Sequence, residues 1–420
     1  MASTIRTGLR SSVAKNAASL YVIQFANYIL PLITVPYLVR VLGPTGYGTI
    51  AFGRSLIAYF ALFVDYGFAL SATRKISVKR NDPIAVSRIA FSVWAAKILL
   101  CTVGFAVLLP LVTVVPKLRD VSVLLLILYG LTVGNALFPT WLFQGMERMV
   151  SISVINLVMR FFVVIGIFTM IHRPEDYLLY GGLTSFGSIA AGVVGAGVAF
   201  WMFQLRPVIP SWRGIQEALA EGWTLFLSTA SVSLYTTGNA LILGLLTNHT
   251  VVGYYSAAER IVKAVAGLLG PISQAVYPRF SKMASESKSS VLYWARRGLL
   301  LQSSLGLFLS IALFVGAPVI VQVVLGTGYE PSITVMRMLA ALPLIIGIGS
   351  SFGRFVLLPF RKDRTRLFIF LIAGFTNVTL AFLLTPMWFA SGMALAVLVS
   401  EVFVTLGFFV YLRINNLSPI

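Results

Sequence analysis

A series of apolar segments, each long enough to cross a lipid bilayer, dominates this sequence. A transmembrane helix needs about 20 mostly apolar residues, and such stretches recur along the 420 residues of the chain. Hydrophobic residues make up 58% of the chain and charged residues 11%, whereas a soluble domain is about a quarter charged. Because no water-soluble packing could hide so much apolar surface, the sequence predicts an all-α integral membrane protein.

The predicted transmembrane helices number twelve, and turn signals such as "LGPTGYG", "HRPEDY" and "TNHT" separate several of them. They cover residues 17–41, 47–72, 89–110, 121–144, 151–171, 178–202, 223–246, 251–277, 298–322, 334–358, 367–385 and 390–412.

Basic residues alternate from loop to loop. One set of segments holds 21 lysines and arginines: the N-terminal leader, the loops at 73–88, 145–150, 203–219, 278–297 and 359–366, and the C-terminal tail. The loops on the other side hold only Lys117, Arg119 and Arg173. Since lysine and arginine are retained on the cytoplasmic side, both termini are predicted to face the cytoplasm. The net charge of +19 is therefore interpreted as a topology signal, and no nucleic-acid partner is expected.

The middle of the chain predicts a division into two halves. The stretch "RPVIPSWRGIQEALAEGW" has two prolines followed by an amphipathic turn. It indicates a cytoplasmic linker at 206–220 between a six-helix bundle at 1–205 and a second one at 221–420. A faint repeat agrees, because Gly46-Tyr47 after the first predicted helix recurs as Gly253-Tyr254 after the seventh. Duplicated halves are common in transporters.

Several kinds of chemistry lack the residues that they need. The single cysteine, Cys101, excludes a disulfide within the chain, and two histidines, His172 and His249, make a histidine metal site unlikely on composition. Neither a nucleotide-binding loop nor an "HExxH" motif occurs. The predicted outer loops are too short for a catalytic domain. No enzyme activity, metal or cofactor is expected, and an ATP-driven pump would need ATP to act through another chain.

A few charged residues lie near the midpoints of predicted helices, where a charge facing lipid costs at least about 2.5–3.5 kcal/mol. These are Lys97, Arg160, Lys263 and Glu401. Glu259 lies four residues before Lys263, so these two could form an ion pair on one helix face. Because the sequence near Lys97 and Arg160 suggests no partner, both are predicted to line a hydrated cavity.

Arg54 and Asp65 are eleven residues apart in the second predicted helix. They share nearly one face but lie roughly 16 Å apart along the axis, so they could line one wall of a central cleft. The alternative for Asp65 is a structural bond to a neighbouring helix. Pro31 and Pro36 in the first predicted helix are candidates for a gating hinge, the alternative being a static kink.

Bases outnumber acids, eight to four, among the ionisable residues within or at the edges of the predicted helices. This balance indicates a cationic cleft suited to an anionic substrate such as a diphosphate or an acidic sugar. The candidate substrate-binding residues are Arg54, Lys97, Arg160, Arg260 and Lys263. The candidates for carrying a coupling proton or cation are Asp65, Glu259 and Glu401.

Three stretches resemble a known family. They are "LPLITVPYLVRVLGPTGYGTIAFGRSLIAYFALFVDYGFALSATRKIS" at 30–77, "WLFQGMERM" at 141–149 and "GYYSAAERIVKAV" at 253–265. They look like the bacterial O-antigen and polysaccharide flippases, a branch of the multidrug/oligosaccharidyl-lipid/polysaccharide exporter superfamily. The resemblance implies twelve helices in two six-helix bundles around a central cleft.

The same resemblance implies a function. Such proteins move undecaprenyl-diphosphate-linked oligosaccharide between the leaflets of the bacterial inner membrane by alternating access, and some relatives use ion gradients. A polysaccharide polymerase and a chain-length regulator would be partners in such a role. Relatives often carry an acid where this chain has Asn239, so coupling here must rest on Asp65, Glu259 or Glu401, or be absent.

Two alternatives remain open. A drug/ion antiporter of the same superfamily would have a smaller, more acidic or aromatic pocket. A membrane-embedded glycan polymerase or ligase would need catalytic side chains on a sizeable outer loop.

Overall fold

A computed structural model describes the backbone of residues 2–419. It describes the side chains of residues 33–419 except those at positions 228, 231, 232, 234–236, 271, 272, 274, 275, 278 and 285. The described chain is helical throughout and contains no strand. Such a fold is expected in lipid, because a helix satisfies its backbone hydrogen bonds within itself where no water is present.

The first part of the chain forms nine α-helices and one 3-10 turn. They are α1 (Ala2–Asp65), α2 (Phe68–Lys79), α3 (Pro83–Val114), α4 (Pro116–Arg119), α5 (Ser122–Leu137), α6 (Thr140–Gly145), α7 (Met149–Met170), the turn η1 (Pro174–Asp176), α8 (Tyr177–Phe203) and α9 (Trp212–Thr237).

The second part forms seven α-helices and two short π-helices. They are α10 (Asn239–Leu246), α11 (His249–Gly267), α12 (Gly270–Glu286), α13 (Lys288–Ile320), the π-helix η2 (Val321–Leu325), α14 (Pro331–Leu339), α15 (Leu342–Ser350), the π-helix η3 (Ser351–Leu357) and α16 (Asp363–Ile414).

Every predicted transmembrane stretch falls on helix, but the observed helices do not divide into twelve. Within the described residues, eight helical stretches are long and apolar enough to cross a membrane. The first two predicted helices are joined in α1, which is interrupted at Gly43 with φ 65°. The last two are joined in α16, which is interrupted at Phe389 with φ 50°. The seventh and eighth, at α9–α12, are not among the eight, so the number twelve remains a prediction.

The hinge candidates also lie in α1. Its recorded interruption is at Gly43, seven residues after Pro36. Pro36 itself is partly buried within continuous helix, and the side chain of Pro31 lies outside the described residues. Whether either proline acts as a hinge remains a prediction.

The chain divides into two compact units. Unit 1 comprises Met1–Val41 and Leu56–Leu227, and unit 2 comprises Leu42–Ser55 and Ser228–Ile420. The two compact units divide inside α9, and residues 206–220 lie within unit 1. The predicted linker at 206–220 between two six-helix bundles remains a prediction. A short part of α1 also belongs to the second unit.

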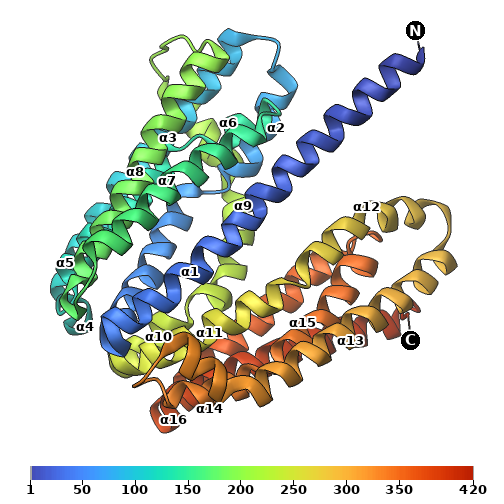
Figure 1. The fold of residues 1–420 in the computed structure, drawn as a ribbon. Coiled ribbons are helices and arrows are strands. Elements are labelled where there is room, and N and C mark those ends of the chain that lie inside the picture. Colours follow the sequence, from blue (N-terminus) through green and yellow to red (C-terminus); the bar gives the residue numbers. More distant parts are fainter. Residues whose placement is uncertain (1, 420) are drawn as a thin grey trace. The chain divides into compact units, whose positions relative to one another are not determined.

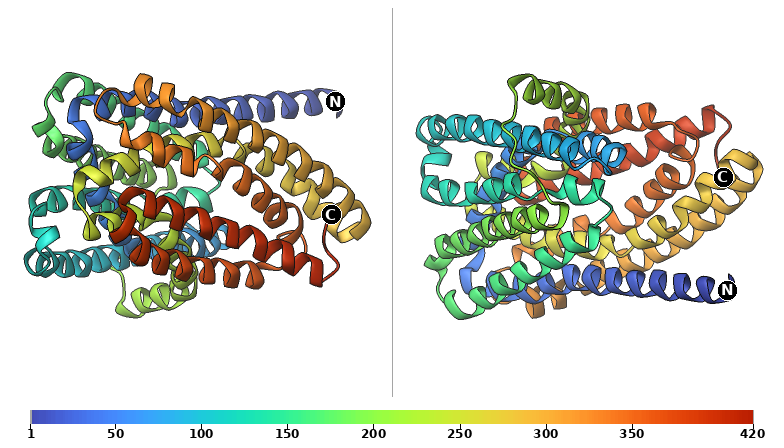
Figure 2. Two further views of the ribbon diagram at one scale, coloured as in Figure 1. Left: turned by 90° about the horizontal axis from the view of Figure 1, so that it is seen from below. Right: turned by 90° about the horizontal axis from the view of Figure 1, so that it is seen from above.

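Small residues bring the helices of unit 1 close together. Helices α3, α5, α7 and α8 run alongside one another in Figures 1 and 2, and α5 and α8 share the most extensive contact. A Cβ on Gly134 of α5 would overlap Ser188 of α8. Next to this crossing, Ser185 Oγ donates to the carbonyl oxygen of Ile127 at 2.7 Å. Close backbone approach through small residues is how membrane helices associate without a hydrophobic driving force.

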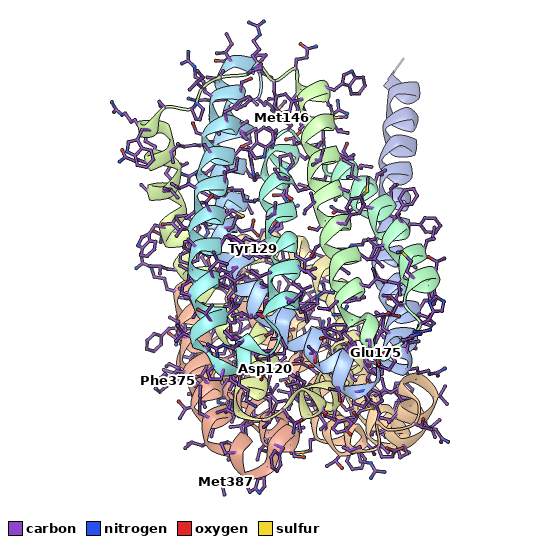
Figure 3. The ribbon with its side chains drawn as sticks, turned by 90° about the vertical axis from the view of Figure 1, so that its left-hand side faces the viewer. Asp120, Tyr129, Met146, Glu175, Phe375 and Met387 are labelled. Atoms are coloured by element: carbon purple, nitrogen blue, oxygen red, sulfur yellow. The ribbon has the colours of Figure 1, made fainter. Side chains whose placement is uncertain are left out.

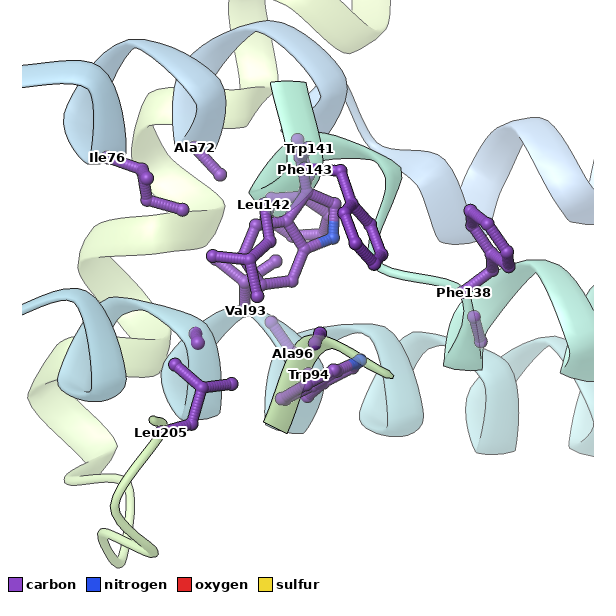
Figure 4. Packing of buried hydrophobic residues seen from close by; sticks show 14 of the residues in the cluster. Ala72, Ile76, Val93, Trp94, Ala96, Phe138, Trp141, Leu142, Phe143 and Leu205 are labelled. Atoms are coloured by element: carbon purple, nitrogen blue, oxygen red, sulfur yellow. The ribbon is translucent and has the colours of Figure 1, made fainter. Parts of the chain in front are cut away.

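A cluster of aromatic rings fixes the short helix α6 in unit 1. The ring of Trp94 stacks on Phe200 at 5.6 Å and meets Trp141 edge-on at 5.8 Å. Its indole Nε1 donates to the carbonyl oxygen of Leu137 at 3.1 Å, where α5 ends. Figure 4 shows Trp94 and Trp141 among the buried side chains of this cluster. The indole therefore supplies both the packing and a partner for a helix-terminal carbonyl.

The loops of unit 1 alternate between its two ends as the sequence predicts. Figure 3 shows Asp120 and Glu175 toward one end, Met146 toward the other, and Tyr129 between them. The turns with Asp120 and Glu175 belong to the predicted outer set of loops, and the turn with Met146 belongs to the predicted inner set.

Candidate functional site

A buried ion pair joins three helices of unit 1. Nζ of Lys97, on α3, donates to Oδ1 of Asp65 at 2.9 Å and to the carbonyl oxygen of Asn135 at 3.1 Å. Nδ2 of Asn135, on α5, donates to the other carboxylate oxygen of Asp65 at 2.8 Å. The Lys97 side chain is only 3% exposed, whereas that of Asp65 is 43% exposed. The lysine is thus enclosed and neutralised, while its carboxylate partner remains accessible from one side.

Local backbone geometry holds Asp65 at the end of α1. Tyr66 and Gly67 both have positive φ, 43° and 79°, and they separate α1 from α2. A Cβ on Gly67 would lie 2.7 Å from Cβ of Leu225 on α9, so the turn packs tightly there. The ring of Tyr66 stacks on Phe226 at 5.0 Å with an interplanar angle of 11°. Asp65 therefore lies directly before a turn that is wedged against α9.

This geometry corrects one prediction and confirms an alternative. The expectation that Lys97 has no partner is wrong, because its partner comes from another helix, 32 residues away in the chain. The alternative that Asp65 bonds to a neighbouring helix is confirmed. Asn135 was not among the predicted site residues, although it is a lone amide in the apolar run of α5. Such a residue is energetically costly in a membrane helix unless it bonds to a partner.

A second charged cluster lies in unit 2. Nζ of Lys263 is 2.9 Å from Oε1 of Glu259, one turn earlier on α11, so the predicted intrahelical pair is confirmed. The hydroxyl of Tyr255 donates to the same carboxylate at 2.9 Å. Glu401 on α16 is close enough to Lys263 to interact with its charge. Lys263 is therefore paired with Glu259, and its charge also acts on Glu401, a carboxylate from a second helix.

Asn239 adjoins this cluster at the start of α10. Its side chain lies beside the Tyr255 hydroxyl and the residue is 3% exposed. Its Oδ1 is buried without a hydrogen-bond partner among the described residues. Asn239, where relatives of the resembled family often carry an acid, thus lies next to Tyr255, the tyrosine that bonds to Glu259.

The remaining predicted bases occupy separate helices. Arg160 lies on α7, and it is exposed, as are Arg54 on α1 and Arg260 on α11. The structure therefore groups the predicted site residues into two sets, Asp65 with Lys97 and Glu259 with Lys263 and Glu401. That all of them line one cleft remains a prediction.

The two copies of the faint repeat meet within unit 2. A Cβ on Gly48 would overlap the carbonyl oxygen of His249, and a Cβ on Gly253 would overlap that of Pro44. The hydroxyls of Thr45 and Thr250 are 2.9 Å apart. The segment Leu42–Ser55 and helix α11 therefore cross at backbone contact, which only glycine permits.

A buried tyrosine lies beside both copies of the repeat. Tyr329, in the turn between η2 and α14, is close to Tyr47 and Tyr254, and burial raises the pKa of its phenol above the ordinary value. The rings of Tyr254 and Tyr329 meet edge-on at 6.0 Å.

Two solved structures share this fold. One is described as "Lipid II flippase MurJ, inward closed conformation", with a TM-score of 0.78 and 14% identity over 94% of this chain and 88% of that one. The other is an inward-facing multidrug resistance MATE family transporter of the MOP superfamily, with a TM-score of 0.66 and 14% identity over 92% of this chain and 95% of that one. The protein is thus a multi-pass membrane protein with the fold of this class of transporters.

The chain belongs to the polysaccharide biosynthesis protein family, whose model matches residues 13–284. A curated relative from Escherichia coli (strain K12), described as "Putative O-antigen transporter", is 31% identical over 97% of this chain and 98% of its own length. A relative from Shigella dysenteriae with the same description is 28% identical over 93% of this chain and 98% of its own. The resemblance to polysaccharide flippases is thereby confirmed at the level of the family.

Proposed function

We propose that this protein is a flippase for undecaprenyl-diphosphate-linked oligosaccharide, the repeat unit of an O-antigen or an exopolysaccharide. The observation that carries the proposal is the similarity to the E. coli protein described as an O-antigen transporter, which extends over 97% of the chain. The shared fold with a lipid II flippase supports it, since that protein's described cargo is also a lipid.

The exposed bases are suited to bind the diphosphate, the part that all such lipid-linked substrates have in common. A diphosphate carries negative charge that must lose water at bilayer depth, and arginine forms bidentate hydrogen bonds with phosphate oxygens. Arg54, Arg160 and Arg260 have exposed side chains, and Lys263 is half exposed. We propose Arg160 in unit 1, and Arg54, Arg260 and Lys263 in unit 2, as the candidates for contact with the diphosphate. Lys97 is too enclosed to reach a substrate and instead holds Asp65.

Asp65 is our first candidate for ion coupling. Its carboxylate is accessible on one side and neutralises an enclosed ammonium on the other. Proton binding to the carboxylate would leave the Lys97 charge uncompensated, which is costly in a buried place. Protonation would therefore weaken the link between α1 and α3, and alternating access could use that change. Glu259 and Glu401 are the second candidates, because Lys263 serves both.

The proposed location is the bacterial inner membrane with both termini in the cytoplasm. The alternation of basic and base-poor loops supports this orientation through the retention of lysine and arginine on the cytoplasmic side. A polysaccharide polymerase and a chain-length regulator are the proposed protein partners, since they would act on the delivered repeat unit.

Reconstitution tests the activity directly. Full-length protein would be placed in vesicles containing a fluorescent undecaprenyl-diphosphate oligosaccharide, and a membrane-impermeant quencher would then be added. An active flippase brings the labelled lipid of the inner leaflet to the outer leaflet, so its fluorescence is quenched over time. In protein-free vesicles the labelled lipid of the inner leaflet stays protected from the quencher. Equal protection with and without protein would overturn the proposal.

Complementation tests the cationic contacts. In cells that lack the protein, Arg160→Ala should restore no surface glycan although the variant accumulates normally. Lys117→Ala is the matched control, because Lys117 is an exposed base on α4 in a predicted outer loop and should restore wild-type glycan. Normal glycan with Arg160→Ala would remove Arg160 from the site.

A drug/ion antiporter is the second candidate function. The observation that favours it is the fold shared with the MATE family transporter, whose TM-score is 0.66. This function predicts efflux of ethidium from loaded cells, abolished when the ion gradient is collapsed. A lipid-linked oligosaccharide flippase predicts no such efflux.

A further inference from the structure

A groove of about 670 Å³ lies within unit 1, and its lining includes neither Asp65 nor Lys97. Its walls come from α2, the first turns of α3, the segment 204–211 and the start of α9. Arg80, which follows α2, forms a 2.7 Å ion pair with Glu147. The groove is therefore at the end of unit 1 where Figure 3 shows Met146, the end predicted to be cytoplasmic.

The charge of the groove is positive. Four bases line it, together with only two acids, Glu217 and Glu221. Both acids already have partners, because Glu221 is 2.8 Å from Lys75 and Glu217 is 3.2 Å from Arg213. The other three lining bases are exposed, and no described acid lies within ion-pair distance of them: Arg74, Lys79 and Arg88.

Much of the remaining lining is apolar, and part of it is exposed. Ile209 is 94% exposed and Val78 is 80% exposed, and both line the groove beside the bases. Ile89 and Val208, which are partly buried, and Phe68, which is buried, add further apolar lining. A site for a free phosphate ion would gain nothing from such walls, whereas the boundary between headgroups and acyl chains provides an apolar phase next to fixed negative charge.

We propose that this groove binds the phosphodiester headgroup of an anionic membrane phospholipid. Arg74, Lys79 and Arg88 contact the phosphate, and an acyl chain lies along Val78 and Ile209. Basic pockets at the cytoplasmic ends of membrane helices suit this chemistry, since anionic lipid is enriched in that leaflet. The bound lipid would tie α2 to α3 and to the start of α9.

Lipid binding to the purified full-length protein tests the proposal. Native mass spectrometry would compare dioleoyl-phosphatidylglycerol with dioleoyl-phosphatidylcholine, and we expect selective retention of phosphatidylglycerol. The triple variant Arg74→Gln/Lys79→Gln/Arg88→Gln should bind it at least about tenfold more weakly, since it loses all three charges that attract the phosphate. The matched control Lys288→Gln/Arg296→Gln/Arg364→Gln removes three exposed bases of unit 2 and should retain the lipid.

A second variant keeps the test decisive if the triple variant folds poorly. Ile209 is almost fully exposed, so Ile209→Asp should fold normally and repel the phosphate from the groove, weakening phosphatidylglycerol binding. Unchanged binding in both variants would overturn the proposal, as would equal retention of phosphatidylcholine. Complete displacement of the lipid by inorganic pyrophosphate would identify a site for soluble phosphate and would also overturn it.

Discussion

The ammonium of Lys97 lies 2.9 Å from a carboxylate oxygen of Asp65, and Asn135 bonds to both residues. Each of the three comes from a different helix of unit 1, so one polar contact fixes α1, α3 and α5 against one another. The lysine side chain is almost fully buried, and its charge is tolerable only while the carboxylate stays ionised.

Removing the carboxylate should destabilise the protein. Asp65→Ala leaves a buried ammonium without a counter-charge, which costs about 3–5 kcal/mol in a fully buried pair. We expect a loss of about 2–3 kcal/mol, because Asp65 is 43% exposed and solvent screens part of the interaction. Thermal unfolding of the detergent-solubilised protein would show this loss as a lower Tm.

The double variant Asp65→Ala/Lys97→Met is the control for that experiment. It removes both charges and should regain most of the lost stability, because two apolar side chains replace the pair. A double variant no more stable than the single one would show that the pair contributes little.

Asp65→Asn tests ion coupling, and its thermal unfolding is measured alongside because the amide also leaves Lys97 without a counter-charge. The amide keeps the size of the carboxylate and can still accept a hydrogen bond from Lys97, but it cannot bind and release a proton. If Asp65 carries the coupling proton, flipping should no longer respond to an imposed pH gradient across the vesicles. Full, gradient-dependent flipping by Asp65→Asn would exclude Asp65 and leave Glu259 and Glu401.

The pair on α11 allows a charge exchange. Glu259→Lys/Lys263→Glu preserves the intrahelical pair, whose stabilising effect is about 0.3–0.5 kcal/mol in an exposed helix, so the fold should be retained. It places a carboxylate beside Glu401, however, and moves the base by one turn. We expect loss of surface glycan at normal protein level, measured by complementation. Normal glycan would show that only the pairing matters.

The glycine crossing in unit 2 predicts a strong steric effect. Gly253→Val should separate α11 from the segment 42–55, because even a Cβ would overlap the carbonyl oxygen of Pro44. A clash with backbone cannot be relieved by side-chain rotation, so we expect at least about 2 kcal/mol of destabilisation, measured by thermal unfolding, and little flipping.

Gly267→Ala on the same helix is the matched control for this substitution. Nothing lies within 4 Å of a Cβ built at Gly267, and alanine favours helix over glycine by about 1 kcal/mol. The control should be as stable as the wild type or more so. If Gly253→Val behaved like Gly267→Ala, the crossing would not be tight in the membrane.

The features predicted correctly from sequence are those that depend on near neighbours in the chain. Helical segments follow from long apolar runs, because a helix satisfies its own backbone hydrogen bonds in lipid. The pair between Glu259 and Lys263 follows from a spacing of four residues, which places two side chains on one helix face. The family followed from continuous stretches such as 30–77.

The features missed from sequence depend on which helix faces which. Lys97 seemed to lack a partner because Asp65 and Asn135 are 32 and 38 residues away in the chain. The contact of Leu225 on α9 with the turn at Gly67, which lies within unit 1, likewise joins residues far apart in the chain. The predicted division at 206–220 remains a prediction.

Three features follow from the amino-acid sequence without a structure: a helical membrane protein, the alternation of its loops and the presence of charged residues within apolar segments. Apolar length and loop charge act locally, so composition and spacing suffice to predict them. Which of those charges neutralise one another, and which bases remain around the groove of unit 1, became visible in the folded protein. Those outcomes depend on how helices distant in the chain are rotated and packed, and small contact residues such as Gly48 and Gly134 give no sequence signal of their partner.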